Sequence, residues 1–184
     1  MPKTHYFLGQ GAKAVGMTTV YAAKIACQNE RDRKAYAEAA RRLLHEAVMR
    51  EYALDSNAYT EKKGANGKPY LEGAPFCFNL SHSKEYVVCA LSDCDVGVDI
   101  EKLRSISEGV MRRFVGTCTE SDEENTRLWT RYEAIGKFLG VGIPYKTTSD
   151  VYFVKEYFDL DGYAVTVCSE KDAFAEQVVI VSSE

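Results

Sequence analysis

The chain has 184 residues, of which 46% are hydrophobic and 27% are charged, and its formal net charge is −4. This size permits a buried core in one domain or in two small lobes. The acidic balance argues against general nucleic-acid binding, which requires a basic excess. No apolar run reaches the length of a membrane span, and the N-terminus lacks a secretory signal pattern. We therefore expect a cytoplasmic protein that binds neither nucleic acid nor membranes.

The six cysteines contain no C-x-x-C pair, and only three histidines accompany them. A structural zinc site is therefore not expected. In a cytosolic chain of this size we expect the thiols to be reduced, with Cys89 and Cys168 as small core residues of apolar strands.

A long helix is predicted from a cap at Asn29 or Asp32 to about Leu54. The preceding segment, Met17 to Cys27, mixes strand-favouring residues with helix-favouring alanines and stays undecided. The core face of the helix is predicted to carry Tyr36, Ala40, Leu43, Leu44, Ala47 and Val48. The remaining surface is basic and carries Arg31, Arg33, Lys34, Arg41, Arg42 and Arg50. Because acidic residues are interspersed, the residues alone favour an ordinary solvated face.

The segment from Asp55 to Gly67 is polar and contains two glycines, so it is predicted to be a loop. Lys68 then precedes a proline, which favours an extended backbone that projects the lysine side chain from a turn. A strand is predicted near Phe76 to Leu80, followed by Ser81-His82-Ser83. The next strand, Tyr86 to Leu91, has no polar interruption, as is typical of a strand buried on both faces.

His82 lies between two serines at the end of the predicted strand. A lone histidine is more often a hydrogen-bonding residue of the core or surface than a functional group. Between two serines, however, it is placed to offer hydrogen-bond donors to an anion.

The stretch Val96 to Glu101 alternates apolar residues with Gly97, Asp99 and Glu101. In a strand the last three share one face, so two carboxylates lie beside a glycine that leaves room. Two carboxylates at such a short distance repel each other unless a cation lies between them or one of them is protonated. Mg²⁺ prefers such oxygen ligands. The alternative is an edge strand whose outer face is acidic.

The segment around Trp129 is predicted to be a helix, because apolar residues recur at helical spacing and form a buried stripe. The stripe consists of Leu128, Tyr132, Ile135 and Leu139. Glu133 and Lys137 lie four residues apart on its flank. Taken alone, they are better explained by an ordinary surface ion pair.

A further helix is predicted at Ser107 to Val115, before this one, and strands are predicted after it. Val151 to Tyr157 and Tyr163 to Cys168 are joined through Asp161-Gly162, a hairpin signal. Val178 to Val181 is predicted to be a last strand. Helices mixed with antiparallel strands indicate the α+β class.

Four motifs, in this order, resemble those of the Sfp-type 4′-phosphopantetheinyl transferases. They are Gly67-Lys68-Pro69, Phe78 to Ser83, Val96 to Glu101, and Trp129 to Lys137. The resemblance implies two similar α/β lobes related by a pseudo-twofold, with residues 1–96 in one lobe and 97–184 in the other. It also implies a monomer that transfers the 4′-phosphopantetheine arm of coenzyme A to a serine of an apo acyl or peptidyl carrier protein.

The resemblance also implies roles for residues at the matching positions. Asp99, Glu101 and Glu133 would bind Mg²⁺, with Glu133 as the base for the carrier serine and Lys137 as the cation at the departing phosphate. The remaining contacts to the phosphates of coenzyme A would come from Arg33, Arg41, Lys68, Ser81 and His82.

One residue departs from the family pattern, because Tyr132 stands where a lysine usually precedes the glutamate. Two alternatives stay open, and this departure supports the first of them. One is a protein that retains coenzyme A binding but has lost transfer activity. The other is a Mg²⁺-dependent phosphohydrolase that uses the same acids.

Overall fold

The computed structural model describes residues 16–25, 32–141 and 151–182 of the chain. Its helical elements are α1 (Arg33–Tyr52), η1 (Ser56–Ala58), α2 (Glu108–Val110), the π-helical turn η2 (Met111–Val115) and α3 (Asp122–Phe138). Its strands are β1 (Thr19–Lys24), β2 (Thr60–Lys63), β3 (Pro69–Glu72), β4 (Cys77–Ser83), β5 (Tyr86–Ser92), β6 (Val96–Lys102), β7 (Phe153–Tyr157), β8 (Tyr163–Ser169) and β9 (Val179–Val181).

The strands form two main sheets, of order β4-β5-β1-β9 and β6-β8-β7, and β2 and β3 form a separate hairpin. Every strand pair among these is antiparallel except β1 with β9. This arrangement confirms the mixed α+β class with largely antiparallel sheets. In the described part of the chain, no helix is both long enough and apolar enough to cross a bilayer.

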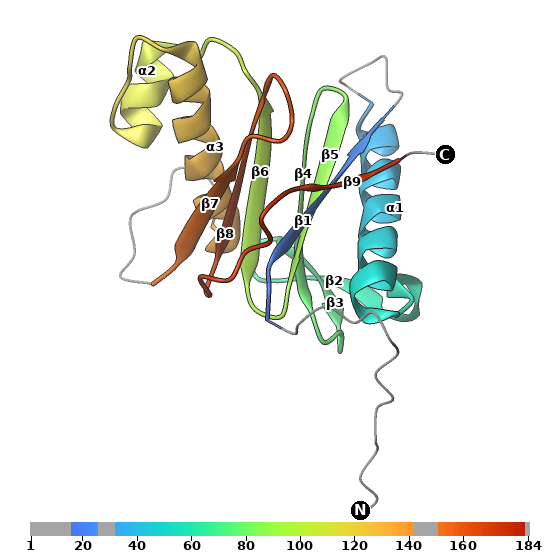
Figure 1. Cartoon of the computed structure of the whole chain (residues 1–184). Coiled ribbons are helices and arrows are strands. Elements are labelled where there is room, and N and C mark those ends of the chain that lie inside the picture. Colours follow the sequence, from blue (N-terminus) through green and yellow to red (C-terminus); the bar gives the residue numbers. More distant parts are fainter. Residues whose placement is uncertain (1–15, 26–31, 142–150, 183–184) are drawn as a thin grey trace, which may run out of the picture.

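The elements stack in four layers, with α1 and α3 on the outside and the two sheets between them (Figure 1). One apolar core lies between the sheets and includes Val20, Val88, Val98 and Val165. A second core packs α1 onto the first sheet, and a smaller one packs α3 onto the second. Each sheet is therefore buried on both faces, which explains the nearly continuous burial of β5 and β8.

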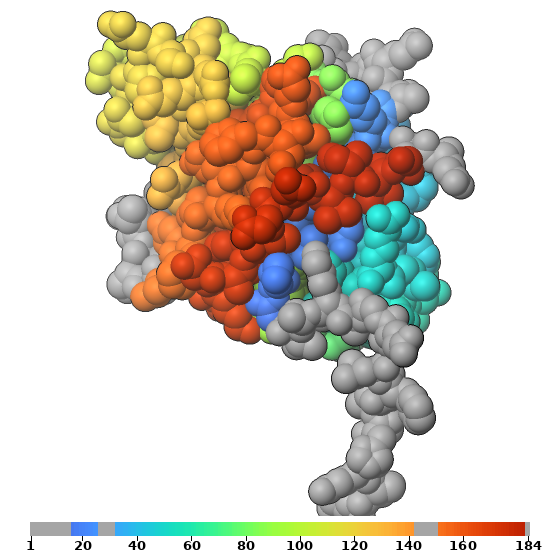
Figure 2. Space-filling model, viewed as in Figure 1, coloured from blue at the N-terminus to red at the C-terminus, as the bar shows by residue number. Residues whose placement is uncertain are grey.

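The last strand, β9, belongs to the sheet of the first half of the chain, where it pairs with β1. In Figure 2 the C-terminal segment (red) runs from the second sheet (orange) toward α1 (cyan). The division at residues 96 and 97 stays a prediction, but this strand crosses it.

The undecided segment from Met17 to Cys27 contains β1. Its residues are buried on both faces, with Val20 and Ala22 between the sheets and Tyr21 against α1. Tertiary burial thus outweighs the helix propensity of the alanines, as commonly happens for short segments. Cys27 lies outside the described residues.

The helix prediction is confirmed at its cap and along its core face. Asp32 is the N-cap residue of α1 and accepts a hydrogen bond from the Ala35 amide at 3.0 Å. All six predicted core residues of this helix are buried. Asn29, the other proposed cap, and Arg31 lie outside the described residues. The hairpin of β7 and β8 and the burial of Cys89 and Cys168 are also confirmed.

The loop predicted for Asp55 to Gly67 is wrong in part. This segment contains η1 and β2, and β2 pairs with β3. All four residues of β2 are exposed, so the strand has no apolar alternation that a sequence pattern would reveal.

Candidate active site

Gly97, Asp99 and Glu101 lie on the face of β6 that α3 covers, while the valines and isoleucine between them point into the core between the sheets. A Cβ atom on Gly97 would lie 2.3 Å from the Ala134 carbonyl oxygen and 2.3 Å from the Phe138 amide nitrogen. Only glycine fits at this distance. The glycine therefore lets α3 approach the strand that carries the two acids.

Asp99 is 2% exposed and receives two hydrogen bonds on the same oxygen. Ser81 Oγ donates to Asp99 Oδ1 at 2.8 Å, and Lys137 Nζ donates to it at 2.6 Å. Lys137 Nζ also donates to Ser81 Oγ at 2.8 Å. Three motifs thus meet at one carboxylate, from β4, β6 and α3.

The edge of β4 is joined to β6 by side chains rather than by a strand ladder. Asn79 and Ser83 lie on the same side of β4 as Ser81. Asn79 Oδ1 accepts a hydrogen bond from the Val98 amide at 2.9 Å, and Ser83 Oγ accepts one from the Lys102 amide at 3.1 Å. Sequence reasoning did not assign Asn79 or Ser83, although the alternation of polar residues in this stretch was the available signal.

The Glu133 carboxyl is the most strongly perturbed acid of the site. Its pKa is raised to about 7, first by burial and then by the negative charge of Asp99. The positive charge of Lys137 and a hydrogen bond with Trp129 oppose this rise, whereas the charge of Glu101 adds to it. Glu133 therefore lies within electrostatic reach of both acids of β6.

The pKa of Glu101 is raised for the same reasons as that of Glu133. Burial raises its pKa, and the charge of Asp99 raises it as well. Arg104, whose Nε lies 3.6 Å from Glu101 Oε2, and a hydrogen bond from Ser83 act in the opposite direction. The two carboxylates of β6 thus repel each other, as predicted from their shared face of the strand.

Within the described residues, no three His, Cys, Asp or Glu side chains are grouped as a formed metal site. Lys137 instead provides the cation next to Asp99. The donor set nevertheless fits Mg²⁺, which favours carboxylate oxygens. Asp99 Oδ2 is buried without a hydrogen-bond partner, and burial together with the charge of Asp99 raises the pKa of both Glu101 and Glu133.

His82 points to the other side of β4, where its ring stacks on Tyr36 of α1 with centroids 4.1 Å apart. Burial lowers the pKa of His82, and the charge of Lys137 lowers it further. The imidazole is therefore favoured in its neutral form, which still has one N–H to donate.

Lys68 contacts the end of α3, where its Nζ donates to the Phe138 carbonyl at 3.2 Å and to Asp95 Oδ1 at 3.3 Å. Beside it is a pocket of about 290 Å³. The pocket is lined by Asn66, Gly67, Lys68, Pro69, Asn79, Leu80, Gly136, Lys137, Gly140 and Val141. The pocket therefore brings together residues of three motifs, among them Lys137, which contacts Asp99.

The two predicted arginines are on the exposed face of α1. Arg41 has a side chain that is 65% exposed, and its Nε lies 3.8 Å from Glu61 Oε2 of β2. Arg33 is the first residue of the helix and is also exposed. Their roles stay predictions.

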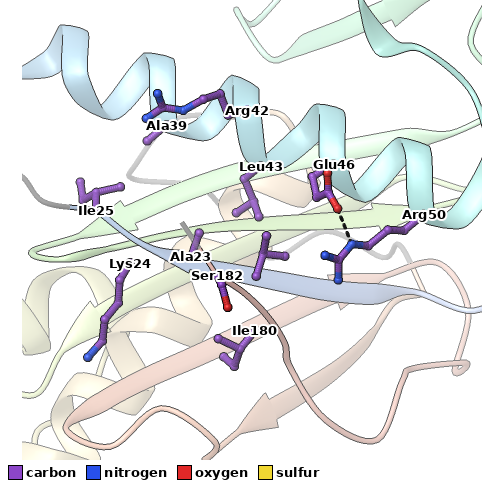
Figure 3. Close-up of a pocket in the computed structure, with 11 residues that line it drawn as sticks. Ala23, Lys24, Ile25, Ala39, Arg42, Leu43, Glu46, Arg50, Ile180 and Ser182 are labelled. Atoms are coloured by element: carbon purple, nitrogen blue, oxygen red, sulfur yellow. Dashed lines mark hydrogen bonds and ion pairs between the residues drawn. The ribbon is translucent and has the colours of Figure 1, made fainter. Parts of the chain in front are cut away.

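A second pocket, of about 550 Å³, lies between α1, β1 and β9 (Figure 3). Its cationic lining residues are Lys24, Arg42 and Arg50, and Arg50 pairs with Glu46 at 2.6 Å. No residue of the four motifs lines it. Part of the basic surface of α1 therefore faces a different pocket from the one beside Lys137.

Tyr132 is only 9% exposed, and its ring centroid lies 6.0 Å from that of Trp129. This position agrees with the prediction that it belongs to the buried stripe of the helix. The residue that replaces the family's lysine is thus largely part of the packing.

No protein-family model matches the chain. The chain is, however, 31% identical to the 4′-phosphopantetheinyl transferase psf-1 of Bacillus pumilus, over 80% of its own length and 78% of that protein. It is 28% identical to the 4′-phosphopantetheinyl transferase Sfp of Bacillus subtilis strain 168 and to ffp of Bacillus subtilis, in each case over 77% of both chains.

Proposed function

The chain belongs to the Sfp-type 4′-phosphopantetheinyl transferases, and from this premise we propose that it modifies a serine of an apo acyl or peptidyl carrier protein in a Mg²⁺-dependent reaction. The arm comes from coenzyme A, and adenosine 3′,5′-bisphosphate is released. The observation that supports this proposal most is the hydrogen-bonded group of Asp99, Ser81 and Lys137, which unites three of the four family motifs at one buried carboxylate.

In this proposal the hydroxyl oxygen of the carrier serine attacks the β-phosphorus of coenzyme A, and the bond to the bridging oxygen of the pyrophosphate breaks. Asp99, Glu101 and Glu133 would hold Mg²⁺, which supplies charge neutralisation at the pyrophosphate. The Glu133 carboxylate takes the proton of the serine. Its pKa of about 7 in the absence of a metal is suited to a general base near neutral pH.

Lys137 would stabilise the negative charge that develops on the departing bisphosphate. Its Nζ already lies between Ser81 and Asp99, so it enters the reaction from a fixed position. A positioned cation needs little reorganisation during the reaction, which is the main source of its effect in a site from which water is excluded.

The other contacts to coenzyme A would come from the residues around the pocket of about 290 Å³ and from the end of β4. Lys68, Ser81 and His82 would bind phosphate oxygens there, and Arg41 and Arg33 would add positive charge from α1. Because Lys68 is engaged with Asp95 and the end of α3, a phosphate would have to share or displace these contacts.

We also propose that the two sheets with their outer helices are the two similar lobes of the family, related by a pseudo-twofold. The first lobe, residues 1–96, places α1 on its sheet, and the second, residues 97–184, places α3 on its sheet. Strand β9 then extends from the second lobe into the sheet of the first.

A mixture of the protein, coenzyme A, Mg²⁺ and an apo carrier protein tests the function. We expect mass spectrometry to find the phosphopantetheine arm on the carrier serine. A carrier with alanine in place of that serine, and a reaction with EDTA, are the controls. Binding of coenzyme A without modification of any acyl, polyketide or peptidyl carrier would instead indicate a binding protein. Hydrolysis of coenzyme A without a carrier would indicate a phosphohydrolase.

A further inference from the structure

Two buried polar atoms with no hydrogen-bond partner in the structure belong to residues that are directly opposite each other. They are Asp99 Oδ2 of β6 and Thr166 Oγ1 of β8. Asp99 is 2% exposed and Thr166 is 1% exposed. Side chains of directly opposed residues in an antiparallel pair lie on the same face, with Cβ atoms about 5 Å apart. The two unpartnered atoms therefore belong to neighbouring side chains on one face of the sheet.

An unpaired buried polar atom is destabilising, so a hydrogen bond between two such atoms at opposed positions would stabilise the fold. The chemistry is complementary, because a hydroxyl donates and a carboxylate only accepts. The competing acceptor is Glu156 of β7, which is opposite Thr166 on its other side. Glu156 is only partly buried, so water can satisfy its carboxylate, whereas Asp99 is 2% exposed and its Oδ2 is buried.

We propose that Thr166 Oγ1 donates a hydrogen bond to Asp99 Oδ2, directly or through one buried water, and is thereby a positioning residue for the carboxylate that binds Mg²⁺. This inference rests on the proposed function. With Ser81 and Lys137 on Oδ1, the Asp99 carboxylate is then held by groups from β4, α3 and β8. A carboxylate has about four lone-pair sites, so these bonds leave room for a metal ligand bond.

The test removes the hydroxyl but keeps the shape of the side chain, in Thr166→Val. We expect the Mg²⁺ concentration for half-maximal transfer to rise about tenfold, the lower end of the usual effect of losing a group that orients a metal ligand. Turnover at saturating Mg²⁺ should change little. Binding of Mn²⁺, followed by electron paramagnetic resonance in the presence of coenzyme A without a carrier, should weaken by the same factor. Thr166→Ser should restore both values.

The matched control is Thr19→Val. Thr19 Oγ1 is also buried and unpartnered, but Thr19 is in β1 of the other main sheet. Its substitution should leave metal binding unchanged. If Thr166→Val does not fold, Thr166→Ala removes the same hydroxyl.

Wild-type metal affinity in folded Thr166→Val or Thr166→Ala would overturn the inference, as would an equal effect of Thr19→Val or a failure of Thr166→Ser to restore binding. The failure of the proposed function looks different. In that case the wild-type protein itself would show neither transfer nor metal binding.

Discussion

Replacing Gly97 by alanine should displace α3 and disable the site through a single added methyl group. The new Cβ would lie 2.3 Å from the Ala134 carbonyl oxygen and the Phe138 amide nitrogen, and 2.8 Å from the Phe138 Cα. All three are backbone atoms, so no side-chain rotation relieves the clash. The helix and the strand must separate by about 1 Å to reach ordinary contact distances.

Such overpacking typically costs about 1–3 kcal/mol, and the rigid surroundings of Gly97 place the change near the upper value. In a chain of this size, 3 kcal/mol corresponds to a fall in Tm of about 6–12 °C. The same displacement moves Lys137 away from Asp99 and Ser81, now 2.6 Å and 2.8 Å from its Nζ. A misplacement of 1 Å costs about a hundredfold in rate, so turnover should fall by that factor in a protein that still folds.

Urea unfolding and single-turnover transfer to a carrier measure the two effects. The matched control is Gly109→Ala in α2, because a Cβ there meets no atom within 4 Å. Its stability should stay within about 0.5 kcal/mol of the wild-type value. Wild-type stability and turnover in Gly97→Ala would refute the argument that this glycine sets the position of α3.

The remaining predictions concern the seam between the sheets, the acids and the phosphate contacts. Asn79→Ala should lower the free energy of unfolding by about 1–3 kcal/mol, because the Val98 amide loses its acceptor; an unchanged urea midpoint would contradict this. Since the pKa of Glu133 is raised from 4.5 to about 7, the folded state binds the extra proton between these values. In EDTA the protein should therefore lose stability as the pH rises through this window, and Glu133→Gln should remove this part of the slope in pH-dependent unfolding. Tyr132→Lys should change single-turnover rates by less than about tenfold, or roughly 1.4 kcal/mol, since the tyrosine is mostly packing; a rise of several hundredfold would contradict this. Calorimetry should show coenzyme A affinity falling with added salt and in Lys68→Ala, and no loss in either case would locate the phosphates elsewhere.

The parts of the fold that the sequence predicts are those set by local patterns. The cap at Asp32, the buried stripe of α1 and the turn at Asp161-Gly162 each depend on a few neighbouring residues. The exposed strand β2 has no such pattern, because its stability comes from pairing with β3. The three residues of β9 also do not reveal which sheet the strand joins. It pairs with β1 because the edge of β1 is open, and this depends on the packing of the whole chain.

The acids of the site could be predicted because each lies in a motif whose period fixes its face. Alternation places Asp99 beside Gly97, and the helical repeat places Glu133 one turn before Lys137. The hydrogen-bond partners of these acids could not be predicted in this way. Ser81, predicted only as a phosphate contact, bonds to Asp99 across the seam between two sheets that share no ladder at that edge.

Contacts of that kind depend on which strand edges meet, and this is decided by the packing of the whole molecule. The polar residues of β4 alternate because every second one must satisfy a group of β6, in place of the backbone ladder that the seam lacks. The stretch from Phe78 to Ser83 therefore has a structural requirement as well as the role that its family resemblance implies. It fixes the distance between β4 and the carboxylate strand, so substitutions there should affect stability and transfer together, whereas a residue that only binds phosphate should affect transfer alone.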